Sequence, residues 1–288
     1  MTLRFLRDDP LPHGAVEEAA PGVRRMVCDN PGPFTFRGTN TYLIGRGDVV
    51  VLDPGPVDAT HLSAILRATE GERITRVLVS HTHRDHSPGA AALMAATGAR
   101  SLGFGPHLTP GAEGGDHDFR PDVTLPDGAA VEGDDWRLTA IHTPGHCANH
   151  LCFAMEGSGV LFSADHVMGW STSVVSPPDG DMAAYMESLA RIAARDDRLY
   201  LPGHGPPLPD PAPFVAALAA HRREREAKVL DALRVSRRAT AGELVTAVYG
   251  PELDPRLAPA AARSLLAHLV KLADEGEARQ EGEVFEAA

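Results

Sequence analysis

Cysteine is scarce in this chain, with three residues in 288: Cys28, Cys147 and Cys152. Their number is odd, and they lack the close spacing of a thiolate metal site, so we expect no metal site built on sulfur. Such cysteine usage is typical of a reducing compartment, and we therefore expect a cytoplasmic protein. Cys147 is interpreted as a plain buried thiol.

Long apolar runs are also missing. The chain has no stretch of about 18 apolar residues, so we expect no transmembrane helix and no membrane partner. Residues 1–10 contain charges and proline but no apolar signal core, which argues against secretion. Aromatic residues make up only 5% of the chain, so alanine, valine and leucine must fill most of the core. The length suffices for one large core, with or without a small second domain.

Lysine is absent from residues 1–214, which hold 16 arginines against 27 acidic residues, a net charge of about −11. Residues 215–288 hold 11 basic and 12 acidic residues and are nearly neutral, within a total of −12. An acidic region of this size disfavours polyanions such as RNA at long range. Bound metal ions would reverse the local potential, so a nucleic-acid partner is disfavoured rather than excluded.

The most informative stretch that is present runs from Ser80 to His86, with three histidines and one aspartate in its last six positions. It follows a strand expected over residues 74–80 and precedes a helix expected over 88–97, with Ser87 as its N-cap and Pro88 at its first position. Ligands and chemistry usually sit at that edge of an α/β sheet. Imidazole and carboxylate are preferred ligands of zinc and similar divalent ions, so the loop indicates a metal site.

Hydrophobic patterning predicts the other elements of a large first domain and a small second one. Strands are expected at 23–28, 39–44, 49–52, 100–104, 129–132, 136–142, 150–155, 159–164 and 199–201. Helices are expected at 58–69, capped by Asp58, and at 181–195, with a loop at 105–122. A proline-rich break at 206–213 places the domain boundary between residues 211 and 212. Beyond it we expect helices at 213–234, 240–249 and 258–275 and a hairpin at 277–285.

Four further residues stand at the ends of short apolar runs: Asp53, His146, Asp165 and His204. A lone histidine after Pro-Gly, as at His146 and His204, is usually a turn residue. The combination of all four with the Ser80–His86 stretch, in this order, is not accidental. His107, His117, His142, His150, His166 and His221 are expected outside the ligand set, with His142 and His150 as candidates to line the pocket.

These residues resemble the metallo-β-lactamase superfamily over about residues 20–210. The resemblance implies an α/β fold, a four-layer αββα sandwich, with the metal site at one edge. It assigns one metal to His81, His83 and His146, a second metal to Asp85, His86 and His204, the bridge between them to Asp165, and orientation of a ligating histidine to Asp53.

A closer resemblance is to the β-lactamase-like protein 2 group. It rests on residues 30–35, residues 38–43 and a tail that begins at residues 221–225 and resembles a winged helix. That group includes a mitochondrial endoribonuclease and many bacterial hydrolases, so it narrows the architecture more than the reaction. Arg222, Arg223 and Arg225 alternate with glutamates and are expected on a solvated helix face rather than on a nucleic acid.

The function that we expect is hydrolysis by a hydroxide held between two divalent metal ions, most simply zinc, with iron and manganese as alternatives. Asp85 and Asp165 would be the catalytic carboxylates, and the substrate a small ester, thioester, lactone or amide-like molecule. Rival interpretations are an endoribonuclease or phosphodiesterase acting on single-stranded RNA, a mononuclear iron persulfide dioxygenase, and a regulatory protein without activity. A homodimer is left open.

Overall fold

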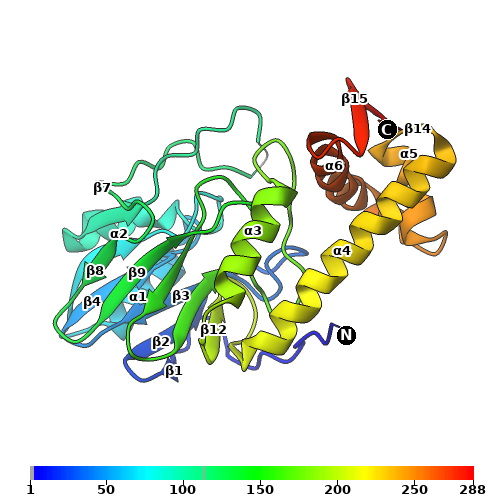
Figure 1. Cartoon of the computed structure of the whole chain (residues 1–288). Coiled ribbons are helices and arrows are strands. Elements are labelled where there is room, and N and C mark those ends of the chain that lie inside the picture. Colours follow the sequence, from blue (N-terminus) through cyan, green and yellow to red (C-terminus); the bar gives the residue numbers. More distant parts are fainter. Residues whose placement is uncertain (1–2, 113) are drawn as a thin grey trace.

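A computed structural model of the chain describes residues 3–112 and 114–288. Figure 1 shows two β-sheets face to face, with a long helix leading from them to a small C-terminal unit. Helices cover the outer faces of the sheets. The main body is therefore the α/β/β/α sandwich that the sequence predicts.

The first sheet has seven strands that follow one another in chain order. Its first four strands pair antiparallel and its last four pair parallel, with α1 (Ala59–Ala68) and α2 (Gly89–Thr97) as crossovers. The strands are β1 (Glu17–Ala20), β2 (Val23–Val27), β3 (Asn40–Ile44), β4 (Asp48–Leu52), β5 (Arg73–Leu78), β6 (Arg100–Gly103) and β7 (Val123–Thr124).

The second sheet has six strands in the order β13-β12-β11-β10-β9-β8. Only β11 and β12 pair parallel among these described strands, and α3 (Met182–Ala193) crosses between them. The strands are β8 (Ala130–Glu132), β9 (Arg137–His142), β10 (Leu151–Met155), β11 (Val160–Ala164), β12 (Leu199–Pro202) and β13 (Leu208–Pro209).

Three apolar clusters hold the sandwich together. One lies between the sheets, where Tyr42 meets Phe162 edge to face at 5.2 Å. A second joins α1 and α2 to the first sheet and has only aliphatic and sulfur-containing side chains among its buried members, as the scarcity of aromatic residues predicts. The third joins α3 to the second sheet through residues such as Tyr185. Helix α1 begins as expected, because Asp58 accepts a hydrogen bond from the backbone N–H of His61 at 2.7 Å.

The C-terminal unit follows the predicted order of helices and hairpin. It contains α4 (Pro211–Ser236), α5 (Ala241–Tyr249), a 3-10 turn (Pro255–Leu257), α6 (Ala258–Asp274), and the strands β14 (Arg238–Thr240), β15 (Ala278–Glu281) and β16 (Val284–Ala287). Strand β16 lies between the other two. Leu244, Leu265 and Phe285 pack in the separate core of this unit.

Helix α4 belongs to both units. Phe214 and Leu218 near its start pack with the sandwich, whereas Val229 and Leu233 near its end pack in the C-terminal core. Figure 1 shows this helix running from one body to the other. The expected boundary between residues 211 and 212 falls at the first turn of this helix and stays a prediction.

Two local predictions are wrong. Ser87 does not cap α2: the helix begins at Gly89, and the hydroxyl of Ser87 donates to Asp116 Oδ2 at 2.6 Å instead. Pro88 already has helical backbone angles, which leaves no extended residue to cap. Arg222 is not solvated, because α4 docks on α3 and leaves this side chain 4% exposed over the Tyr185 ring.

Among the described helices, none combines the length and the apolar character that crossing a membrane requires.

Candidate metal centre

The predicted site residues all lie in loops at one edge of the sandwich. The His81–His86 loop follows β5 of the first sheet, whereas the other three ligand candidates belong to the second sheet. His146 lies between β9 and β10, Asp165 directly follows β11, and His204 follows β12. Because the sheets stack face to face, their loops meet at this edge and bring the side chains together.

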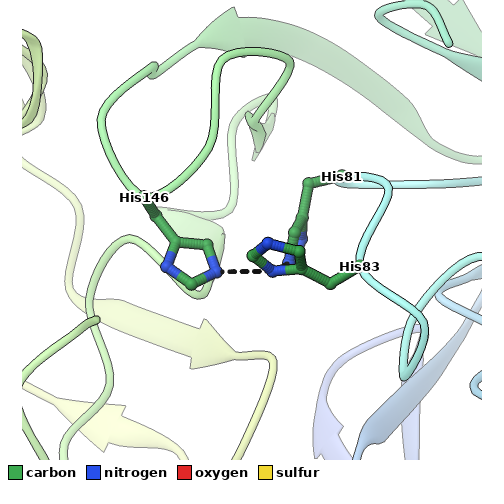
Figure 2. Close-up of side chains that lie close together, drawn as sticks. All are labelled: His81, His83 and His146. Carbon is green, nitrogen blue, oxygen red and sulfur yellow. Dashed lines mark hydrogen bonds between the residues drawn. The ribbon is translucent and has the colours of Figure 1, made fainter. Parts of the chain in front are cut away.

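Three histidines form the first group. His83 Nδ1 lies 3.0 Å from His81 Nε2 and 2.9 Å from His146 Nε2. Figure 2 shows the three rings pointing toward one another from two separate loops. Their ligand atoms all lie within 4.8 Å of each other, so one ion could contact all three. This is the set predicted for one metal.

Asp85, His86 and His204 form the second group. His204 Nε2 lies 3.2 Å from Asp85 Oδ2 and 3.2 Å from His86 Nε2. His86 and His204 are almost fully buried, and the side chain of Asp85 is 29% exposed. These three residues are the set predicted for the other metal.

Asp165 lies between the two groups. Its Oδ2 atom is 3.6 Å from His146 Nε2 and 3.4 Å from His204 Nε2, and its Oδ1 atom is 3.6 Å from His86 Nε2. The carboxylate thus reaches histidines of both groups, which is the position predicted for a bridge. Within residues 3–112 and 114–288, Oδ1 is buried without a hydrogen-bond partner, as expected of a ligand atom.

Groups behind the histidines fix their orientation. Asp53 Oδ2 accepts from His86 Nδ1 at 2.9 Å and from Ser80 Oγ at 2.6 Å, while its Oδ1 accepts from the Ser80 N–H at 2.7 Å. Asp53 therefore lies directly behind His86, and its proposed role of orienting a ligand stays a prediction. His146 Nδ1 likewise meets the carbonyl of Val174 at 2.6 Å. Such contacts on one ring nitrogen aim the other nitrogen at the metal position.

The ionisation states suit a cation site. Burial lowers the pKa of His83 to about 3 and that of His81 well below its usual range, which keeps both imidazoles neutral. Burial also acts on His204, but Asp165 and Asp85 outweigh it and raise the pKa of this histidine to about 9. Burial alone would raise the pKa of Asp165, but His204 and His86 lower it overall. The carboxylates are thus ionised and attract positive charge, and a divalent ion would displace the proton of His204.

The donor set fits two divalent ions. Three imidazoles at one position, and two imidazoles with a carboxylate at the other, are sets that zinc, iron and manganese accept. Gly203 leaves the space for this arrangement, since a Cβ atom there would lie 2.3 Å from Asp165 Oδ1. A further group of His83, Cys147 and Asp179 also has ligand atoms within 4.8 Å. Burial raises the pKa of the Cys147 thiol well above its usual range, so this group is a poor metal site.

A cavity of about 650 Å³ opens over both groups. His83, Asp85, His146, Asp165 and His204 line it together with mostly apolar walls. The walls come from the loops around Phe34, Ala112 and Met168, so the described part of loop 105–122 reaches the site.

One residue that helps to position the site was not predicted from the sequence. His150 is fully buried, and its Nε2 accepts from the backbone N–H of Asp165 at 3.2 Å, so it helps to place the bridging residue. It does not line the cavity, contrary to expectation, and neither does His142. The antiparallel pairing of β10 with β11 brings His150 to Asp165.

The chain belongs to the metallo-beta-lactamase superfamily, which it matches over residues 34–204, and residues 240–286 match the beta-lactamase associated winged helix domain. It is therefore a hydrolase of the metallo-β-lactamase fold, a fold that implies divalent metal binding by the His/Asp cluster. The predicted family, sandwich and winged-helix unit are confirmed.

Relatives with thioesterase names match most of the chain. The chain is 34% identical over 279 residues to an atrochrysone carboxyl ACP thioesterase of Passalora fulva, covering 91% of this chain and 78% of that protein. It is 32% identical over 252 residues to the protein of the same name from Aspergillus chevalieri, covering 84% and 77%. The crystal structure of a beta-lactamase domain protein from Burkholderia ambifaria superposes with a TM-score of 0.83 at 26% identity, covering 98% of this chain and 96% of that one.

Proposed function

We propose that this protein is a thioesterase that uses two divalent metal ions, with zinc as the first choice. The observation that carries the proposal is the convergence of seven histidine and aspartate side chains, five of which line a largely apolar cavity. The thioesterase names of relatives at 32% and 34% identity support the choice of substrate class.

In this proposal His81, His83 and His146 hold one ion, and Asp85, His86 and His204 hold the other. When bound, the two ions would lower the pKa of a shared water and polarise the carbonyl oxygen that is attacked. Asp165 contributes negative charge to both positions and so fixes their separation. Asp85 supplies the second negative charge, which offsets the repulsion between two divalent ions.

The cavity walls supply the other half of a thioester site. Phe34, Met168 and Val174 give an apolar surface for an acyl group, and the site residues lie at its base. An acyl chain seated there places its thioester carbonyl near Asp165, and the walls exclude bulk water from the reacting group.

The protein is further proposed to work in the cytoplasm. Cys28, Cys147 and Cys152 are all buried as free thiols, which fits a compartment that keeps thiols reduced. Cell fractionation with an antibody against the native chain would test this placement.

The deciding experiment combines metal analysis with a substrate panel. Elemental analysis of the purified protein should find close to two transition-metal ions per chain, and one iron per chain would favour the dioxygenase instead. The metal-reconstituted enzyme should then be assayed on thioesters, lactones, aryl esters, phosphodiesters, β-lactams and short RNA. We expect thioesters to give the highest kcat/KM. Full activity without metal would overturn the proposed site, and a clear preference for RNA would overturn the proposed substrate.

A further inference from the structure

The cavity over the metal centre is built by both units of the protein. Most of the described residues that line it come from loops of the sandwich, but Arg263 comes from α6 of the winged-helix unit. The C-terminal unit therefore contributes Arg263 to the lining of the same cavity that His83 and Asp165 line.

A second arginine lines this cavity from the sandwich. Arg84 stands between the proposed ligands His83 and Asp85, so the metal loop itself sets its position. Its backbone N–H donates to Gly114 O at 2.9 Å and its Nε donates to Gly115 O at 3.1 Å. These bonds hold Arg84 beside Gly114 and Gly115, and Gly114 lines the cavity too.

We propose that Arg263 and Arg84 bind an anionic group of the substrate. The inference rests on the proposed thioesterase function and names the kind of thioester that the site prefers. Guanidinium groups present forked N–H donors that match the oxygens of a phosphate or a carboxylate. The sandwich carries about −11 in formal charge, so an anionic substrate needs local positive charge to approach. Among the residues that line the cavity, Arg84 and Arg263 can contact such an anion directly, beside the acidic Asp85, Asp165 and Asp179.

The anion has two possible sources with the same chemistry: a phosphate on the thiol arm, or a carboxylate at the end of the acyl chain. One acyl group should therefore be presented on N-acetylcysteamine, which is neutral, and on phosphopantetheine, which carries a phosphate. On the neutral arm, a plain acyl chain should be compared with one that ends in a carboxylate. In one of these two pairs we expect the anionic substrate to have a kcat/KM at least ~10-fold higher than its neutral partner, mainly through a lower KM.

The variant Arg263→Met should lower the ratio of kcat/KM for the anionic substrate to kcat/KM for the neutral substrate toward one. Arg263→Lys should retain part of this preference. The matched control is Arg256→Met, on the same unit, because Arg256 is exposed, pairs with Asp254 and does not line the cavity. Equal kcat/KM for neutral and anionic substrates in the wild type would overturn the inference, and so would an Arg263→Met enzyme that keeps the full ratio. If no thioester is hydrolysed at all, the proposed function fails. Calorimetric binding of free phosphopantetheine, and of a free dicarboxylate, to wild type and Arg263→Met then still tests the anion site.

A separate observation concerns Arg222 of α4. Its side chain is buried, its guanidinium lies 5.2 Å from the centre of the Tyr185 ring, and its Nη2 donates to the carbonyl of Ser173. The next residue, Val174, is the one whose carbonyl meets His146 Nδ1. The long helix thus holds the segment that orients a proposed metal ligand.

We infer that Arg222 is a positioning residue for the first metal position, acting through Ser173, Val174 and His146. Loss of a group that supports a metal ligand typically weakens metal binding or activity by about 10- to 100-fold, and Arg222 is one step further away. We therefore expect Arg222→Met to weaken metal binding by about 10-fold, and Arg222→Lys to restore part of it because lysine can still donate to Ser173.

Chelator competition measures the affinity, and the visible absorption of the cobalt-substituted protein reports the geometry of the ligands. Arg223→Met is the matched control, because Arg223 follows Arg222 on the same helix but is exposed. A folded Arg222→Met with wild-type affinity and an unchanged cobalt spectrum would overturn the inference. If that variant does not fold, Arg222→Lys decides in the same way.

Discussion

Replacing Asp165 with asparagine tests the proposed bridge most directly, because the change keeps the shape and removes the charge. The side chain is 8% exposed and lies 3.4 to 3.6 Å from histidines of both metal groups. Amide oxygen is a weaker ligand than carboxylate, so the two ions would repel each other with less compensation. The second position should suffer most, because Asp85 would then be its only carboxylate.

The magnitude follows from Coulomb's law for a carboxylate next to a positive charge. At an effective dielectric constant of about 20, two unit charges ~3.5 Å apart interact by about 5 kcal/mol. The amide dipole recovers part of this, which leaves a loss of about 3 kcal/mol, or at least ~10²-fold in turnover, on the scale of removing one electrostatic element from an active site. The fold should survive, because β11 and its core contacts are unchanged.

The assay is turnover together with metal content and thermal unfolding of Asp165→Asn. The competing interpretation is that Asp165 merely caps the turn after β11, where asparagine would serve nearly as well. Asp58→Asn is the matched control, since Asp58 does cap a helix. Asp165→Asn that keeps two metals and unchanged turnover would rule out the bridge.

Three other changes probe the site and the fold. Gly203→Ala should lower metal affinity by ~10-fold or more, because the added Cβ would meet Asp165 Oδ1. Chelator competition measures this affinity. Gly242→Ala is the control and should leave the affinity unchanged, since the nearest atom to its added Cβ lies 3.9 Å away. Burial lowers the pKa of His61 to about 4, so the unfolded chain takes up a proton below about pH 6.5 that the folded chain refuses, and stability falls from there toward pH 4. His61→Gln should flatten that dependence by ~1.4 kcal/mol per pH unit in urea unfolding, and an unchanged slope would contradict this. Truncation after Pro211 should leave metal binding detectable but lower solubility, since Phe214 and its neighbours no longer cover the sandwich; complete loss of metal binding would refute the proposed boundary.

Much of the fold could be predicted because the signals are local. The run Val49–Leu52 is apolar and mostly β-branched, belongs to a fully buried strand and ends just before Asp53, as expected. Ligand candidates that follow strands running in the same direction share an edge of the sheet, and β9, β11 and β12 run in the same direction. The order of His146, Asp165 and His204 along the chain, each after an apolar run, therefore carries spatial information by itself.

Other features depend on which surfaces dock, and the sequence does not report them. The alternating charges around Arg222 look like a solvated helix face, yet docking of α4 on α3 buries that one side chain. Arg263 lies far along the chain from the metal loop, and only the placement of α6 brings it to the cavity. Ser87 has the local pattern of a cap, but Asp116 from a distant loop takes its hydroxyl.

Backbone hydrogen bonds join the two sheets at the edge of the sandwich where the proposed ligands meet. The Asn40 N–H of the first sheet donates to Gly203 O of the second at 2.7 Å, directly before His204. The Leu151 N–H of the second sheet donates to Ser80 O of the first at 2.7 Å, directly before the metal loop. Both proposed metal positions draw ligands from the two sheets, and these backbone bonds fix the sheets to each other beside the ligands. These bonds therefore help to hold the ligand loops of both sheets in the positions that the proposed site requires.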